Sequence, residues 1–159
     1  MAARLTRLAL LLVVAAFMAA PARAQSDDAV TFVRDFYVKE IAQHAAKKYA
    51  READFLSVFT ADAQKVWHAA QANRNKPNSS LGPILHVFLG QGALPGREIK
   101  LGAVTSSGGD AVSVALTVQG NPRQLIVHTV RDGGTWKFSD IDYGGGESFM
   151  ARFRRLSAP

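Results

Sequence analysis

The sequence predicts an α+β domain, with N-terminal helices packed on a curved, cone-like antiparallel sheet of about four strands and a short C-terminal helix. Apolar residues recur at helical spacing in the first half of the chain and alternate in four later runs, and glycine-rich turns separate those runs. Helices that precede strands favour segregated layers over a regularly alternating α/β arrangement.

Residues 1–24 have the pattern of a secretory signal peptide. Two arginines precede an apolar run from Leu8 to Ala20, and small residues at Ala22 and Ala24 offer a cleavage site. The apolar run is short for a membrane span. We therefore expect a single domain over residues 25–159, periplasmic or secreted, with no stable membrane span after cleavage; a retained N-terminal anchor is the alternative.

Composition argues against several kinds of site and partner. The chain has no cysteine, which removes disulfides, thiol nucleophiles and thiolate metal ligands. Its formal net charge is +6, and loss of Arg4, Arg7 and Arg23 with a signal peptide lowers it to +3. With so small an excess and no nucleic-acid-binding motif, we expect no nucleic-acid partner.

Two helical stretches and a broken run are expected in the first half. Asp27 and Asp28 are candidate caps for a helix whose apolar stripe consists of Val30, Val33, Tyr37, Ile41 and His44. A second pattern runs from Leu56 to Ala70, and Thr60 is placed to cap a new turn within it. The run from Leu81 to Gly96 is apolar but broken by glycine and proline, which predicts a short strand or helical turn across the core.

The second half predicts an antiparallel meander. The four strand-like runs are Arg97–Val104, Ala111–Val118, Arg123–Val130 and Thr135–Asp142. A last turn over residues 131–134 would pair Val127 with Phe138 and Leu125 with Asp140, and a turn at residues 120–121 would pair Val114 with Val127.

These registers give the sheet one apolar face. Its predicted members are Ile99, Leu101, Val112, Val114, Leu116, Leu125, Val127, Trp136 and Phe138. Asp140 falls on the rim of this face, whereas His128 and Ile141 fall on the other side.

The chain ends with a tryptophan strand that runs into D-I-x-Y, then glycines and a Ser-hydrophobic pair that opens a helix. These positions are Trp136, Asp140, Ile141, Tyr143, Gly144, Gly145, Gly146, Ser148 and Phe149. This ending resembles that of a bacterial secreted family of unknown function related to the nuclear transport factor 2-like superfamily. The resemblance implies a cone of helices and bent sheet, a fold that often holds a pocket and serves both enzymes and binding domains.

The leading hypothesis is therefore an exported binding or accessory domain of unknown specific function. It would have a possible pocket between helices and sheet. Its partner would be a small apolar ligand or another protein. The ending is also similar to the tail of periplasmic phospholipid carriers of the toluene-tolerance type, which makes a lipid carrier the first alternative. The second alternative is a small enzyme with Asp140 as general base.

The candidate ligand-binding residues are Asp140, Tyr37 and Trp136. Asp140 is expected to be a structural carboxylate that accepts hydrogen bonds from nearby backbone or from a helix hydroxyl such as that of Tyr37. The four histidines lack metal-ligand spacing, so we expect no metal, and the sequence indicates no cofactor. No serine lies in a nucleophile elbow, so the sequence names no catalytic residue and an enzyme is the less favoured reading.

Overall fold

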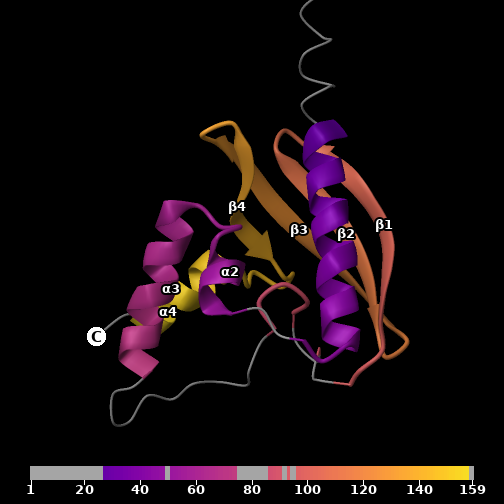
Figure 1. Ribbon diagram of the computed structural model, residues 1–159, viewed down its shortest axis with the longest axis horizontal. Helices are drawn as coiled ribbons and strands as arrows, with labels where there is room; N and C mark the ends of the chain where they lie inside the picture. The colour runs from indigo at the N-terminus through magenta and orange to yellow at the C-terminus, as the bar shows by residue number, and fades with distance from the viewer. Residues whose placement is uncertain (1–26, 49–50, 75–85, 91–92, 94–95, 158–159) are drawn as a thin grey trace, which may run out of the picture.

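The computed structural model describes residues 27–48, 51–74, 86–90, 93 and 96–157, and confirms the predicted α+β class. The elements are a first helix over residues 27–45, α2 (Glu52–Leu56), α3 (Ala61–Arg74), β1 (Ile99–Gly108), β2 (Ala111–Val118), β3 (Asn121–Asp132), β4 (Thr135–Asp142) and α4 (Phe149–Ser157). The strands form one antiparallel sheet in the order β1-β2-β3-β4, which does not close on itself (Figure 1). The expected signal peptide lies outside the described residues.

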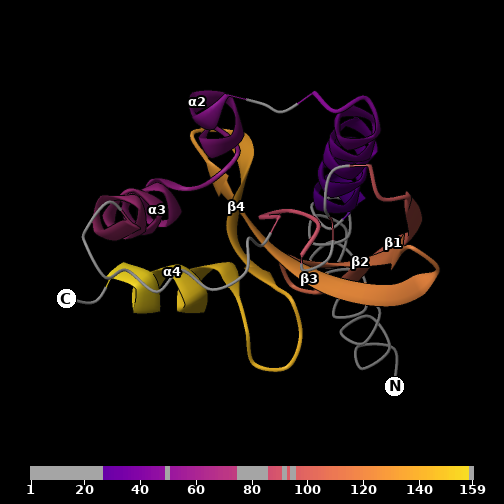
Figure 2. The ribbon, with the colours of Figure 1, turned by 90° about the horizontal axis from the view of Figure 1, so that it is seen from below.

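The first helix lies across one face of the sheet (Figure 2). Its buried residues, Ala29, Val33, Tyr37 and His44, follow the predicted stripe, and Val30 and Ile41 pack against the same core. The guanidinium of Arg34 donates to the carbonyl of Val104 on β1 at 3.2 Å. Helical spacing alone therefore identified the face that meets the sheet. No helix in the described part of the chain is long and apolar enough to cross a membrane.

The turns of these hairpins differ from those expected, and this corrects the strand registers: the β3–β4 turn is tighter, and the β2–β3 turn lies one residue earlier, at residues 119–120. β3 and β4 pair Asp132 with Thr135, so that Gly133 and Gly134, with φ of 57° and 82°, form a two-residue turn. Val114 pairs with Leu125 rather than with Val127. The β2–β3 register differs from the prediction by two residues, and an even shift keeps each side chain on its face. The predicted β2 and β3 members of the apolar face are accordingly buried.

A bulge in β4 overturns the predicted positions of its last residues. Phe138 pairs with Thr129, but Asp140 pairs with His128, which leaves Ser139 as an extra residue. As a result Phe138 and Ile141 are both fully buried, although regular alternation would place them on opposite faces. The prediction that Asp140 opposes Leu125, on the face of Phe138, is therefore wrong.

The remaining helices pack beside β4. α3 and α4 lie against each other (Figures 1 and 2), and the Trp67 ring meets those of Phe149 and Phe153 at centroid distances of 6.4 and 4.9 Å. Thr60 accepts a hydrogen bond from the backbone N–H of Ala63 at 3.3 Å, which confirms the predicted cap. The final helix, with Phe149 and Phe153 buried on one side, is also confirmed.

Candidate ligand-binding cleft

A cleft of about 390 Å³ opens between the first helix and α2, and we call it the aromatic cleft. The first helix contributes four lining residues at helical spacing i, i+3, i+4 and i+7, α2 and the residue after it contribute three, and Phe88 completes the set. The lining residues are Phe36, Lys39, Glu40, Gln43, Asp54, Phe55, Ser57 and Phe88. The cleft therefore combines three aromatic rings with charged and polar groups.

The aromatic rings of the cleft belong to a larger cluster. The Phe88 ring lies 4.6 Å from that of Phe36 in an edge-on arrangement, and it stacks on Phe59 at 5.5 Å. The Phe55 ring lies 6.0 Å from Phe88 and 4.8 Å from Trp67. Edge-on and offset ring pairs stabilise each other beyond their burial, so this wall of the cleft is preorganised.

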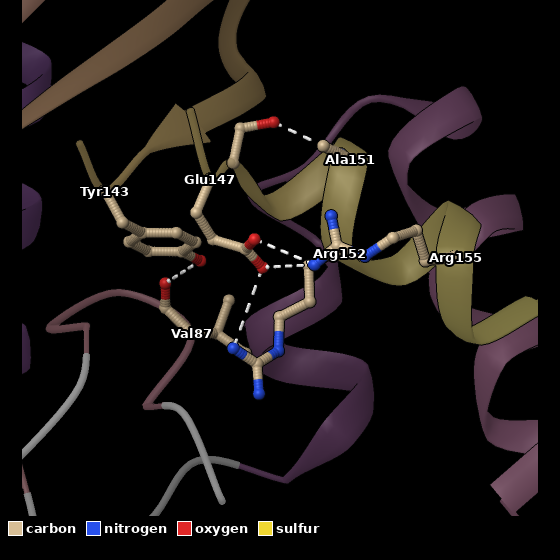
Figure 3. Close-up of polar contacts among 7 residues, drawn as sticks. Val87, Tyr143, Glu147, Ala151, Arg152 and Arg155 are labelled. Atoms are coloured by element: carbon tan, nitrogen blue, oxygen red, sulfur yellow. Dashed lines mark hydrogen bonds and ion pairs between the residues drawn. The ribbon is translucent and has the colours of Figure 1, made fainter. Parts of the chain in front are cut away.

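Two tyrosine hydroxyls hold the segment that carries Phe88. Tyr37 of the first helix donates to the carbonyl of Phe88 at 2.9 Å. Tyr143, which follows β4, donates to the neighbouring carbonyl of Val87 at 2.7 Å (Figure 3). Burial raises the pKa of both tyrosines, so both remain protonated donors at neutral pH. These bonds from distant parts of the chain fix the position of Phe88.

A polar cluster of the buried His44 and the partly buried Glu40 and His86 lies beside the aromatic cleft. The His86 Nε2 atom is 3.6 Å from Glu40 Oε1, and the rings of His44 and His86 meet at 5.6 Å. Burial, followed by the nearby His44, lowers the pKa of His86 to about 4, so His86 is neutral at pH 7. Burial also raises the pKa of Glu40, an effect that Lys39 opposes. Glu40 is the member of this cluster that also lines the cleft.

The two histidines of this cluster have unsatisfied ring atoms. Within the described part of the chain, His44 Nε2 and His86 Nδ1 have no hydrogen-bond partner. His44 is buried, as its place on the predicted apolar stripe implied. No group of three or more metal-ligating side chains among the described residues could hold a metal ion.

The three predicted ligand-binding residues take part in three separate sets of contacts. Tyr37 is fully buried and positions Phe88 rather than lining the aromatic cleft. Trp136 is half-buried, with the Arg131 guanidinium 5.0 Å from the centre of its ring. Asp140 belongs to the cap of α4, described next. Their roles as ligand contacts stay predictions.

Asp140 holds the start of α4 in place. Its Oδ1 accepts from the backbone N–H groups of Ile141 at 2.8 Å and Met150 at 2.9 Å, and its Oδ2 accepts from the Ser148 hydroxyl at 2.8 Å. Ser148 Oγ in turn accepts from the backbone N–H of Ala151 at 3.2 Å. These bonds satisfy two of the helix's free N–H groups and place a carboxylate at its positive end. The backbone contacts expected for a structural carboxylate are therefore present, while Tyr37 bonds elsewhere.

Replacing Asp140 with asparagine should lower the free energy of unfolding by about 1–3 kcal/mol, because the uncharged amide accepts these hydrogen bonds more weakly. Urea denaturation at pH 7 measures this loss. Asp142→Asn is the matched control, since the Asp142 carboxylate accepts one bond from Gly144 at an exposed turn and should matter less. Equal stability of Asp140→Asn and the parent would contradict the capping role.

A second, smaller cleft of about 230 Å³ has Tyr143 in its lining. Its lining residues are Gly90, Arg123, Gln124, Leu125, Tyr143, Gly144 and Glu147. Glu147 is ion-paired with Arg152 at 3.7 Å and Arg155 at 2.8 Å (Figure 3). This cleft is smaller and Tyr143 is its one aromatic lining residue, so the aromatic cleft is the better candidate site.

Comparison of the chain with protein-family models, curated proteins and solved structures finds no match.

Sequence reasoning missed Glu40, Phe88 and His86 as members of the candidate site. One sequence signal for Glu40 existed: it lies four residues before His44, a spacing that places both side chains on the same face of the helix. Phe88 and His86 lie in a run without periodicity, and long-range bonds from Tyr37 and Tyr143 hold that run.

Proposed function

We propose that this chain is an exported binding domain that holds a small, partly apolar molecule in the aromatic cleft. The observation that carries the proposal is the composition of that cleft: three phenylalanines and five charged or polar residues line about 390 Å³. Small-molecule sites typically span roughly 300–1,000 Å³ and combine apolar walls with a few oriented polar groups. Export is supported by the signal-peptide pattern of residues 1–24.

The site chemistry favours binding over catalysis by Asp140. Two of the three hydrogen bonds to the Asp140 carboxylate come from Ser148 and Met150 at the start of α4, and the third comes from the neighbouring N–H of Ile141. Asp140 does not line the aromatic cleft. A general base must reach a substrate proton, whereas this carboxylate is occupied in holding a helix. A phospholipid carrier would need room for two acyl chains, and the aromatic cleft fits a more compact ligand.

A bulky residue in the cleft should weaken ligand binding. Fragments that bind the parent protein are first found by ligand-observed NMR. In Gln43→Trp, an indole added to the cleft wall should weaken those fragments at least about tenfold by competing for the same space. The control is Ala42→Trp, the neighbouring exposed helix position, which does not line the cleft and should leave binding intact.

Two results would overturn the proposal. One is that Gln43→Trp, shown to be folded by circular dichroism, binds every fragment as well as the parent does. The other is that native mass spectrometry of protein purified from its own compartment shows a retained phospholipid, which would favour the carrier alternative.

A further inference from the structure

We propose that the aromatic cleft selects an organic cation, an amine or quaternary ammonium group on a compact apolar body. The inference rests on the proposed binding function and adds the charge of the ligand. It starts from one juxtaposition: the Glu40 carboxylate lies in the same cleft as the rings of Phe36, Phe55 and Phe88.

Glu40 carries a poorly compensated negative charge. Its side chain is only 14% exposed, so the carboxylate has lost most of its contact with water. Its ion-pair partner in the described structure is His86, whose Nε2 is 3.6 Å away, beyond a normal hydrogen bond. His86 is uncharged at neutral pH, since burial lowers its pKa to about 4. A half-buried carboxylate without a cationic neighbour in contact gains when a cation binds beside it.

The rings add a second attraction for the same charge. The face of an aromatic ring is negative, and a cation within about 6 Å of its centre is stabilised by roughly 0.5–2 kcal/mol. Phe36 and Phe55 are both half-buried, so each retains surface that a ligand can meet. Aromatic walls beside the Glu40 carboxylate suit a quaternary ammonium group best, because its charge is spread over its methyl groups and water binds it more weakly than it binds a primary ammonium.

The other charged groups of the cleft are consistent with this selectivity. Asp54 is already paired with Arg51 at 2.9 Å, at the exposed edge of the cleft. Lys39 lies near both acids and lowers the pKa of each, which helps to keep Glu40 ionised. Its own side chain is exposed, and its flexible stem allows the ammonium to stay in water. An anionic ligand would instead face Glu40 at close range.

The test compares two probes of the same shape and different charge. Choline carries a trimethylammonium group, and 3,3-dimethylbutan-1-ol replaces its nitrogen with an uncharged carbon. NMR titration at pH 7.5 and low salt gives the affinity of each. We expect the parent to bind choline at least about tenfold tighter than the alcohol, and Glu40→Gln to reduce this ratio at least about fivefold. Lys39→Gln, which removes a like charge from the same cleft, should raise the ratio.

The outcomes separate this inference from the proposed function. Equal affinities for choline and the alcohol, or a ratio that Glu40→Gln leaves unchanged in a protein that melts like the parent, would overturn the cation preference alone. Failure of both probes while other fragments bind in the cleft would also overturn it alone. Failure of both probes together with an empty fragment screen would overturn the binding function as well.

Discussion

Replacing Phe138 with alanine should lower the free energy of unfolding by about 3–5 kcal/mol, because it opens a cavity at the centre of the core. Phe138 is fully buried, and its ring meets those of Phe32, Phe36 and Phe59 at centroid distances of 5.3, 4.9 and 5.9 Å. Its backbone also bonds to the segment before α3, since its N–H donates to the carbonyl of Val58 at 2.8 Å. One residue thus joins the first helix, the sheet and the aromatic cluster.

Urea denaturation measures this loss, and Phe138→Leu provides a milder variant if the alanine protein does not fold. Val130→Ala is the control. Val130 lies on β3 but is 37% exposed, so its truncation should lower the free energy of unfolding far less than Phe138→Ala does. The half-buried Trp136 should also cost less on truncation, although the sequence placed it on the same apolar face. A Phe138→Ala protein as stable as the Val130→Ala protein would contradict the described core.

Lowering the pH from 7 to 4 should remove about 3 kcal/mol of stability through His86. The pKa of His86 is about 4 in the folded chain, against 6.5 for an unperturbed histidine. The unfolded chain therefore binds more protons between these values. The contribution of His86 to the free energy of unfolding is fully present above pH 6.5 and is lost as the pH falls toward 4. Glu40 acts in the opposite sense, because its raised pKa makes the folded chain hold its proton more tightly.

The difference in acid sensitivity between the parent and His86→Gln isolates the histidine. The variant should lose less stability between pH 7 and 4, and the gap should approach 3 kcal/mol. His128→Gln makes the same substitution at an exposed position and is the matched control. Identical pH profiles for the parent and His86→Gln would show that His86 is not held in a desolvated site.

The layers of the fold were predictable because they depend on periodicity. The stripe of Val33, Tyr37 and His44 needs only helical spacing. The predicted faces of the β2 and β3 residues are correct although the predicted turn positions are wrong, because a register shift of two residues leaves each side chain on the same face. A bulge is different, since one extra residue at Ser139 reverses the alternation and no residue in TWKFSDID marks it.

The candidate site was less predictable because distant segments build it. Glu40 comes from the first helix, Phe55 from α2 and Phe88 from a separate turn, and no spacing rule relates the three. Tyr37 was identified as a candidate, but the hydroxyl that was expected to meet Asp140 holds Phe88 instead. Asp140 was identified because the predicted register placed it on the rim of the apolar face. Its partners Met150 and Ser148 depend on how the glycine turn closes.

The most direct test of the proposed binding site is a residue-resolved NMR map of a fragment bound to isotopically labelled protein. We predict saturable shift changes that are largest at Phe36, Phe55 and Phe88, with Glu40 and Gln43 also affected. Changes centred instead on Arg123, Tyr143 and Gly144, which line the second cleft, or no saturable change with any fragment, would contradict a binding site between the first helix and α2.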